Sequence, residues 1–186
     1  MWSPGGLDRD GFTLKAVISG GNYNYLSGAL GQVRGRELVA QVMPGWRFKR
    51  GTIELKTFAG LDAQSHHLSP NDPDSKLRGD DLGLRTAFEL WAEPTADMMI
   101  ALDGSASTIA SSYAIRAAAG WRLFNSFYAG PEVQAFASDG YTQRRIGAHV
   151  TSFRFGEFEY SAATGYATDS DDREGAYFRV GMSRRY

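Results

Sequence analysis

The stretch Tyr113-Ala-Ile-Arg-Ala-Ala-Ala-Gly-Trp-Arg-Leu123 alternates apolar residues with polar or small ones. In an extended chain Ile115 and Trp121 share one face, whereas Arg116 and Arg122 share the other. This period of two residues is typical of a β-strand with one apolar face, because successive side chains point to opposite sides. The pattern recurs about ten times along the chain, and no segment carries a comparable helical stripe. The sequence therefore predicts an all-β protein.

The composition narrows the class of protein. With 186 residues the chain is long enough for one domain and too short to suggest two. Its 20 basic and 21 acidic residues give a formal net charge of −1, so no overall field favours nucleic acid as a partner. The absence of cysteine excludes disulfides and thiolate metal sites. No stretch is apolar enough for a membrane-spanning helix, and we expect a signal peptide to have been removed from this sequence.

The connections between the predicted strands alternate in length. Tight turns on one side and longer loops on the other are typical of outer-membrane barrels, whose tilted strands of roughly 10–12 residues cross the apolar layer. We therefore predict a single ten-stranded antiparallel up-and-down transmembrane β-barrel in residues 12–186, preceded by a loose N-terminal segment, residues 1–11. The predicted turns are 49–51, 93–96, 125–126 and 154–156, and the predicted loops are 27–36, 66–80, 107–112 and 168–175, with a shorter one near 138–140.

The polar face of the predicted strands carries acids and bases in nearly equal number. A narrow, filled lumen requires this balance, because each buried charge must be paired to avoid a penalty of several kcal/mol. A solvated surface of mixed charge would look similar, but the excess of arginine over lysine favours dense pairing with carboxylates. The predicted lumen residues are Lys15, Arg47, Glu54, Lys56, Asp62, Arg85, Glu89, Asp103, Arg116, Arg122, Glu132, Arg145, His149, Glu159 and Arg179.

Large aromatic residues gather within a few residues of the short turns. Their common level is typical of the aromatic girdle at a membrane interface, although aromatic residues also pack the cores of soluble proteins. Strict alternation turns Trp91 inward beside Glu89, so this residue fits less well than the others. The predicted girdle residues are Trp46, Phe48, Trp91, Trp121, Phe124, Phe153 and Phe155.

Two prolines lie inside predicted strands. Pro44 and Pro131 each neighbour a glycine, and a strand paired on both sides has no free edge to accommodate a residue without an N–H. We predict a bulge or a local break at each proline.

The end of the chain resembles the last strand of an outer-membrane barrel. Tyr186 is a terminal aromatic residue, and Phe178, Val180 and Met182 precede it at alternate positions. Arg184 departs from the pattern where an apolar residue is usual.

No metal or cofactor site is predicted. His66 and His67 are adjacent and point apart in an extended chain, and the acidic segment 168–174 lacks the spacing of a calcium loop. A catalytic site requires a nucleophile beside an oriented base. The candidates are His149 with Ser105, Thr151 and Glu159, and a second pair, His66 and Asp62. A histidine in a polar lumen is more often part of a hydrogen-bond network, so we predict no catalytic constellation.

Five short motifs together carry a family resemblance that extends from Phe12 to Tyr186. In order and spacing they resemble the bacterial cellulose biosynthesis protein BcsS family. The resemblance implies an outer-membrane protein associated with cellulose production, and because no motif is a catalytic signature it assigns no residue a role. The motifs are Met43-Pro44-Gly45-Trp46-Arg47, Phe58-Ala59-Gly60-Leu61-Asp62, Leu90-Trp91-Ala92-Glu93-Pro94, Gly130-Pro131-Glu132-Val133 and Arg144-Arg145-Ile146-Gly147-Ala148.

These observations favour a non-enzymatic accessory role in cellulose biosynthesis or export. A lumen of ten strands that holds so many long charged side chains is too narrow to pass a glucan chain. The expected partners are outer-membrane lipid and, through the external loops, above all 66–80, the export machinery or glucan. Two alternatives remain: an outer-membrane hydrolase acting on lipid or peptide, and a soluble barrel that binds a ligand against an apolar interior.

Overall fold

The structure is a computed structural model that describes residues 2–3 and 9–184. All ten strands belong to one antiparallel sheet in which each strand pairs with its neighbours in the chain, so the predicted ten-stranded up-and-down arrangement is confirmed. The described chain contains no helix whose length and hydropathy would let it span a bilayer. The elements are β1 (Gly11–Ser27), β2 (Gly31–Arg50), β3 (Ile53–Ser69), β4 (Gly79–Thr95), β5 (Met98–Ser107), the short 3-10 helix η1 (Ile109–Ser111), β6 (Tyr113–Leu123), β7 (Phe127–Ser138), β8 (Tyr141–Phe155), β9 (Phe158–Asp169) and β10 (Glu174–Arg184).

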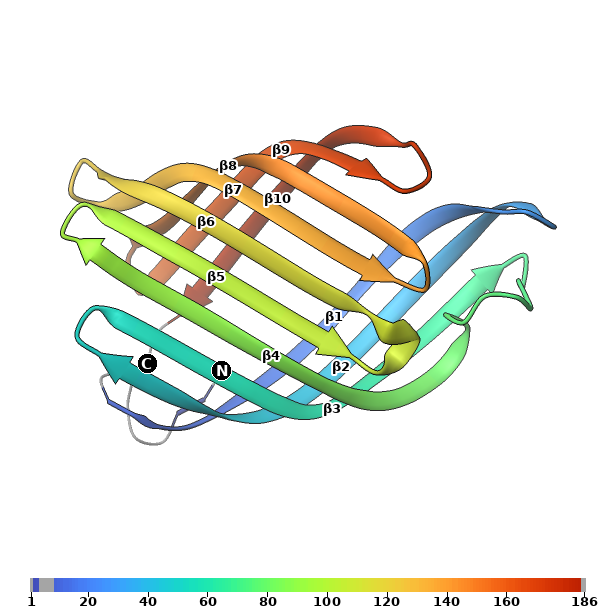
Figure 1. Ribbon diagram of the computed structural model, residues 1–186, viewed down its shortest axis with the longest axis horizontal. Helices are drawn as coiled ribbons and strands as arrows, with labels where there is room; N and C mark the ends of the chain where they lie inside the picture. Colours follow the sequence, from blue (N-terminus) through green and yellow to red (C-terminus); the bar gives the residue numbers. More distant parts are fainter. Residues whose placement is uncertain (1, 4–8, 185–186) are drawn as a thin grey trace.

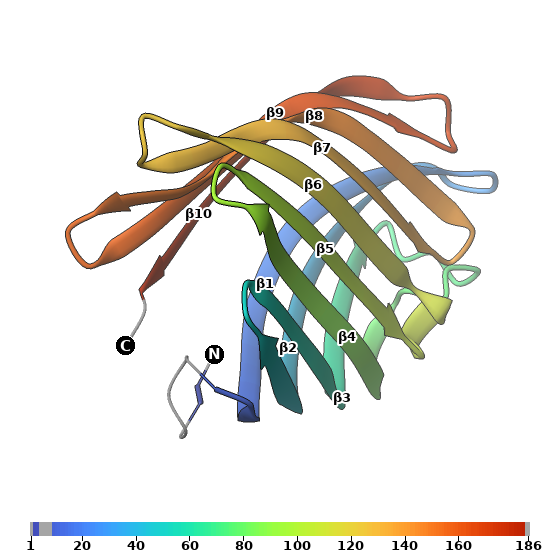
Figure 2. The ribbon, with the colours of Figure 1, turned by 60° about the vertical axis from the view of Figure 1, so that its left-hand side comes forward.

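The sheet curls into a half-barrel whose two edge strands are β1 and β10 (Figures 1 and 2). Among the described residues no backbone pairing joins these edges. One end of the half-barrel carries the longer loops (the loop end) and the other carries the tight turns (the turn end). At the loop end the guanidinium of Arg173, in the β9–β10 loop, donates a hydrogen bond to the Asn24 carbonyl of β1 at 2.8 Å. At the end of the turns Trp2 pairs with Leu14 through two backbone hydrogen bonds of 2.8 Å. The free edge of β1 is therefore contacted by two different segments.

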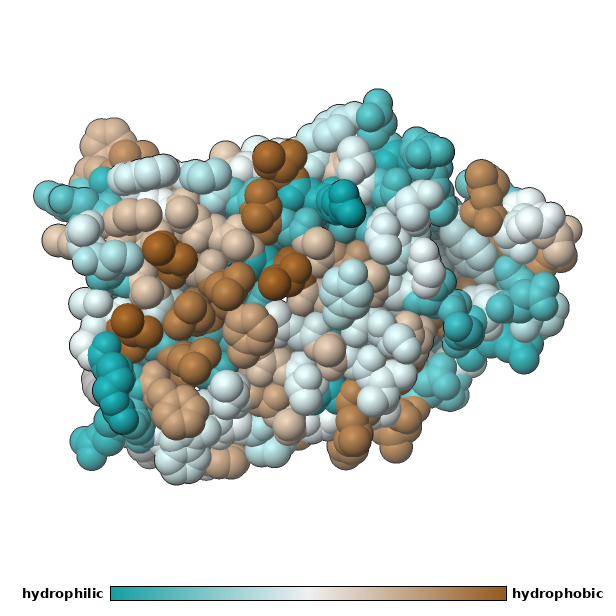
Figure 3. Space-filling view, viewed as in Figure 1, coloured by the Kyte–Doolittle hydropathy of each residue, from teal (hydrophilic) through white to brown (hydrophobic). Residues whose placement is uncertain are grey.

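Most of the large apolar residues of the strands face outward. Ile18 is 82% exposed and Phe178 is 74% exposed, whereas Arg47, Asp62 and Glu132 are buried inside. On the face shown in Figure 3, hydrophobic residues gather over the middle and the turn end, and hydrophilic residues concentrate at the loop end. This is the orientation that the membrane interpretation predicts, and it is opposite to the apolar interior that a soluble ligand-binding barrel requires.

The strands are longer than predicted at the loop end. The predicted loop 27–36 is mostly strand, because β1 and β2 stay paired up to Ser27 and Gly31. The predicted loop 66–80 shrinks to residues 70–78 for the same reason. β1 to β4 have 17–20 residues each, whereas β5, β6 and β7 have 10–12, so the hairpins β1–β2 and β3–β4 project beyond the rest of the sheet (Figure 1).

At each of the two prolines inside strands, the pairing with a neighbouring strand is locally broken. Pairing of β2 with β3 is interrupted at Pro44, and pairing of β7 with β6 is interrupted at Pro131, with the same register on both sides of each gap. The missing N–H of proline explains the gaps. The true register shifts lie elsewhere, at 92–95 in β4 and at 150–153 in β8.

Two glycines in register allow β8 and β9 to curve sharply. A Cβ atom at Gly147 would lie 2.2 Å from the Thr164 carbonyl oxygen and 2.7 Å from the hydroxyl of Tyr177. Its partner Gly165 is likewise too close to β8 for a side chain. The absence of both side chains lets Tyr177 of β10 reach over these strands to Glu132 of β7, 3.5 Å away.

We expect Gly147→Ala to lower the free energy of unfolding by about 1–3 kcal/mol, because the added methyl overpacks this contact. The matched control is Gly175→Ala, where a Cβ atom meets nothing within 4 Å. Urea titration of the detergent-solubilised protein measures both variants. Equal stability of the two would contradict the close approach of β8 and β9.

Candidate functional site

Most of the inward-facing charges of the described residues form three separate clusters. In the first, Lys15 of β1 reaches across the lumen to Glu89 of β4, with 2.5 Å between Nζ and Oε1. Lys56 lies 2.7 Å from Glu54 and 3.7 Å from Glu89. The two lysines and two glutamates compensate one another, so the cluster is close to neutral.

The second cluster surrounds the fully buried carboxylate of Asp62. Nε and Nη2 of Arg85 lie 3.0 and 2.9 Å from one oxygen, and the Ser107 hydroxyl donates to the same oxygen at 2.6 Å. The amides of Gln41 and Gln64 donate at 3.2 and 2.9 Å. With so many donors the charge is well compensated, as a buried carboxylate requires.

The third cluster centres on Glu132, whose side chain is fully buried. One carboxylate oxygen accepts from Arg116 of β6 at 2.7 Å and from Arg179 of β10 at 2.6 Å. Gln134 donates to the other oxygen at 2.5 Å, and Arg116 also pairs with Asp103 of β5 at 2.6 Å. This cluster therefore links β10 to β5, β6 and β7.

Arg47 contacts the N-terminal segment. Its buried guanidinium donates from Nε to the Arg9 carbonyl at 3.1 Å and from Nη2 to the Ser3 hydroxyl at 3.2 Å. Next to it, the backbone N–H of Lys49 and the guanidinium of Arg50 hold the pKa of Asp10 below its ordinary value. The described residues before β1 are thus bonded to the sheet, a role for Arg47 that alternation alone could not reveal.

Two further predicted lumen arginines have aromatic neighbours. The guanidinium of Arg145 lies 5.4 Å from the ring centre of Tyr177 and donates to Gln143 at 2.6 Å. Arg122 lies 4.8 Å from the ring centre of Tyr128 and donates to its hydroxyl. In the described part of the chain neither arginine forms a salt bridge, so cation–π contacts replace the acid partners that we predicted.

The structure does not assemble the catalytic candidates around His149. This histidine is buried inside, and within the described chain neither ring nitrogen makes a well-formed hydrogen bond. The Ser105 hydroxyl accepts a hydrogen bond from Arg85, and Glu159 lies 3.6 Å from Arg154. Among the residues that the structure describes, no nucleophile is therefore paired with this base.

The second candidate, His66, lies between a phenol and an amide. Its Nδ1 is 3.1 Å from the Tyr23 hydroxyl and its Nε2 is 3.2 Å from the side-chain oxygen of Gln64. Gln64, and not His66, bonds to Asp62. Over the described residues no group of three or more acidic, histidine or cysteine side chains is arranged to hold a metal ion.

Trp91 is the exception among the predicted girdle residues. It lies inside the half-barrel against Met99, Ala101 and Tyr128, because alternation along β4 places it on the same face as Glu89. Phe153, beside the register shift in β8, also packs against Phe127. The structure places six of the seven on the outer surface: Trp46, Phe48, Trp121, Phe124, Phe153 and Phe155.

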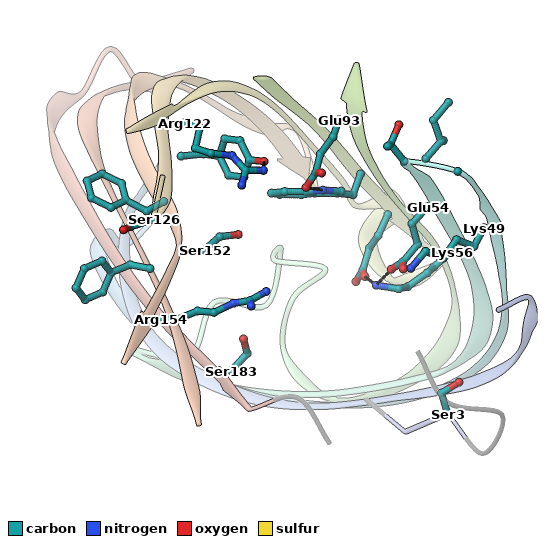
Figure 4. A pocket seen from close by; sticks show the side chains of 18 of the residues that line it. Ser3, Lys49, Glu54, Lys56, Glu93, Arg122, Ser126, Ser152, Arg154 and Ser183 are labelled. Atoms are coloured by element: carbon teal, nitrogen blue, oxygen red, sulfur yellow. Dashed lines mark hydrogen bonds and ion pairs between the residues drawn. The ribbon is translucent and has the colours of Figure 1, made fainter. Parts of the chain in front are cut away.

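A cavity of about 1240 Å³ occupies the turn end of the half-barrel, so the predicted filling of the lumen is incomplete there. Its lining includes the small residues Gly51, Ser126 and Ser183. The first charge cluster and Trp91 contribute to its wall. Figure 4 shows Glu93 and Arg122 along one wall, Glu54 and Lys56 along a second, and Arg154 and Ser183 reaching in from a third.

Comparison with known proteins identifies the family. The family model described as cellulose biosynthesis protein BcsS matches residues 1–186. The chain belongs to this family. A structure described as a KdgM porin resembles this BcsS-family protein with a TM-score of 0.51 at 10% sequence identity, covering 95% of this chain and 98% of that one. At this identity the likeness shows a shared fold. Among curated proteins, none matches the sequence.

We expect Glu132→Gln to lower the free energy of unfolding of this BcsS-family protein by about 3 kcal/mol, because Arg116 and Arg179 lose their buried counter-charge. The control is Asp172→Asn in the exposed β9–β10 loop, which should change stability by less than about 0.5 kcal/mol. Denaturant titration in detergent measures both. A Glu132→Gln protein as stable as the control would show that the third cluster does not support the fold.

Proposed function

We propose that this BcsS-family protein is an outer-membrane barrel that supports cellulose biosynthesis or export as an anchoring, docking or assembly partner. The proposed role is not enzymatic, and the protein is not a wide pore. Family membership supports the link to cellulose, and the porin-like fold supports the membrane location. The observation that carries the narrower role is the set of charge clusters that cross the inside of the half-barrel.

Lipid is the proposed environment of the outer face. Large apolar residues of most strands are exposed at alternate positions on this face. Such a surface is unfavourable in contact with water and favourable in contact with lipid tails. The aromatic residues near the turns, such as Trp46 and Trp121, then lie at one membrane interface, and the turn end faces the periplasm. Polar and charged side chains meet one another inside, where they are shielded from lipid.

The clusters oppose conduction of a glucan chain. Lys15 and Glu89 come from strands that are not neighbours, and so do Arg179 and Glu132; each ion pair therefore passes in front of the strands between. Opening a path would separate these ion pairs and leave the fully buried carboxylate of Glu132 without Arg179. We therefore assign the protein an accessory role and not the transport step.

The projecting hairpins β1–β2 and β3–β4, with loop 70–78, form a docking arm at the loop end. The arm is internally fixed, because the Tyr25 hydroxyl donates to Asp72 at 2.9 Å. Lys76 lies 3.2 Å from Asp139 and ties the loop to the β7–β8 turn. Although burial raises the pKa of Asp72, hydrogen bonds from Tyr25, Ser27 and the backbone N–H of Asp74 hold it below its ordinary value. A fixed, polar projection suits contact with the export machinery or with glucan outside the cell.

Single-channel recording tests the closed lumen. In planar bilayers we expect the wild-type protein to give no large, stable conductance. The quadruple variant Asp103→Ala, Arg116→Ala, Glu132→Ala, Arg179→Ala removes the whole third ion-pair cluster without leaving one partner unpaired, and its conductance should rise several-fold. Asp172→Asn serves as the control. A wild-type conductance equal to that of a wide porin would overturn the accessory role.

Trimming the docking arm tests the cellular role. Replacement of residues 71–77 by a short Gly-Ser linker should lower secreted cellulose several-fold in cells that lack the wild-type copy. The control replaces residues 170–172 of the β9–β10 loop in the same way and should leave output unchanged. A gel shift between unheated and boiled membrane fractions verifies that each variant is folded in the outer membrane. Normal cellulose output from the folded, trimmed variant would contradict docking through this arm.

A further inference from the structure

The charges that line the turn-end cavity are largely compensated by neighbours. Lys56 pairs with Glu54 and Glu89, and Arg154 lies 3.6 Å from Glu159. Glu93 accepts a hydrogen bond from the Trp91 indole N–H at 3.2 Å. A ligand with a net charge would have to displace these partners, so the lining favours an uncharged one. The charged side chains of the lining are Lys49, Lys56, Arg122 and Arg154 against Glu54, Glu89 and Glu93.

Trp91 offers a rigid aromatic surface in the cavity wall. Its indole is held edge-to-face by Tyr128, with 5.9 Å between ring centres and 74° between the planes. Met99 and Ala101 pack against it, and Glu93 fixes its N–H. Because these contacts set the ring in place, a ligand that stacks on it does not have to order a mobile side chain. The flat, C–H-bearing face of a sugar ring is the neutral polar surface that suits such a platform.

Neutral hydrogen-bonding groups complete the lining and come from several strands and turns. Hydroxyls and amides donate and accept at once, as the hydroxyls of a sugar do. At about 1240 Å³ the cavity exceeds the roughly 300–1,000 Å³ that holds a small ligand, so it accommodates several sugar units. It borders the turns, so a ligand enters from the turn end. These lining residues are Ser3, Thr52, Asn125, Ser126, Ser152 and Ser183.

We propose that the turn-end cavity binds a short stretch of uncharged β-linked glucan, with Trp91 as the stacking platform. The largely charge-compensated, hydroxyl-bearing and aromatic lining points to an uncharged oligosaccharide, and the choice of β-glucan rests on the proposed function. The protein thereby holds a chain at its periplasmic end while the charge clusters prevent passage through the lumen. The protein therefore binds the glucan chain and does not conduct it.

Calorimetry on the purified, folded protein in detergent tests the site, with cellohexaose as ligand and maltohexaose as the α-linked comparison. We expect saturable binding of cellohexaose and at least tenfold weaker binding of maltohexaose, because the curved α-linked chain does not extend along the lining beyond Trp91 as a flat β-linked ribbon does. Trp91→Ala should weaken cellohexaose binding at least tenfold. Trp121→Ala, on the outer face, should bind as the wild type does.

A second measurement leaves Trp91 in place and does not depend on the folding of Trp91→Ala. The chain has four tryptophans, so replacing Trp2, Trp46 and Trp121 by phenylalanine makes Trp91 the single indole. Its fluorescence should shift saturably with cellohexaose. No binding by the wild type, equal binding of both sugars, or equal loss in Trp91→Ala and Trp121→Ala would each overturn the proposal. Such a failure leaves cellulose output and channel closure as independent tests of the accessory role.

Discussion

A carboxylate without water around it must have a cationic or hydrogen-bonding partner, and the interior of this half-barrel is organised by that constraint. Glu132 meets it with Arg116 and Arg179, and Asp62 meets it with Arg85 and a serine hydroxyl. Because the partners come from different strands, every such pair also fixes how the sheet curls. The charged residues that look like surface residues in the sequence therefore hold the centre of the fold together.

The same constraint divides the inside of the molecule into two regions. Where long charged side chains face one another, they fill the space and close it. Near the turns a cavity remains beside the first charge cluster. The crossing ion pairs and the cavity are thus neighbouring features of one inward-facing polar surface.

The unequal strand lengths give the two ends of the molecule different characters. At the turn end aromatic residues and short connections mark a level suited to a membrane interface. At the loop end β1–β2 and β3–β4 continue past their neighbours, and Tyr25, Asp72 and Lys76 bind the projection together. A barrel that docks to other components needs such a fixed projection more than it needs a wide lumen.

The sequence by itself determined the strand number, the order of turns and loops, and the breaks at Pro44 and Pro131. It also determined the outward apolar face and the family. These features follow from alternation, turn chemistry and motif order, which are local properties of the chain. Only the tertiary structure decided which charges meet, since Lys15–Glu89 and Glu132–Arg179 join residues far apart in sequence. It also decided that Arg47 binds the N-terminal segment, and that β1 and β10 do not pair with each other within the described chain. Pairing across a lumen depends on how the sheet curves, and close approaches such as Gly147 to Gly165 likewise appear only when the strands are in place.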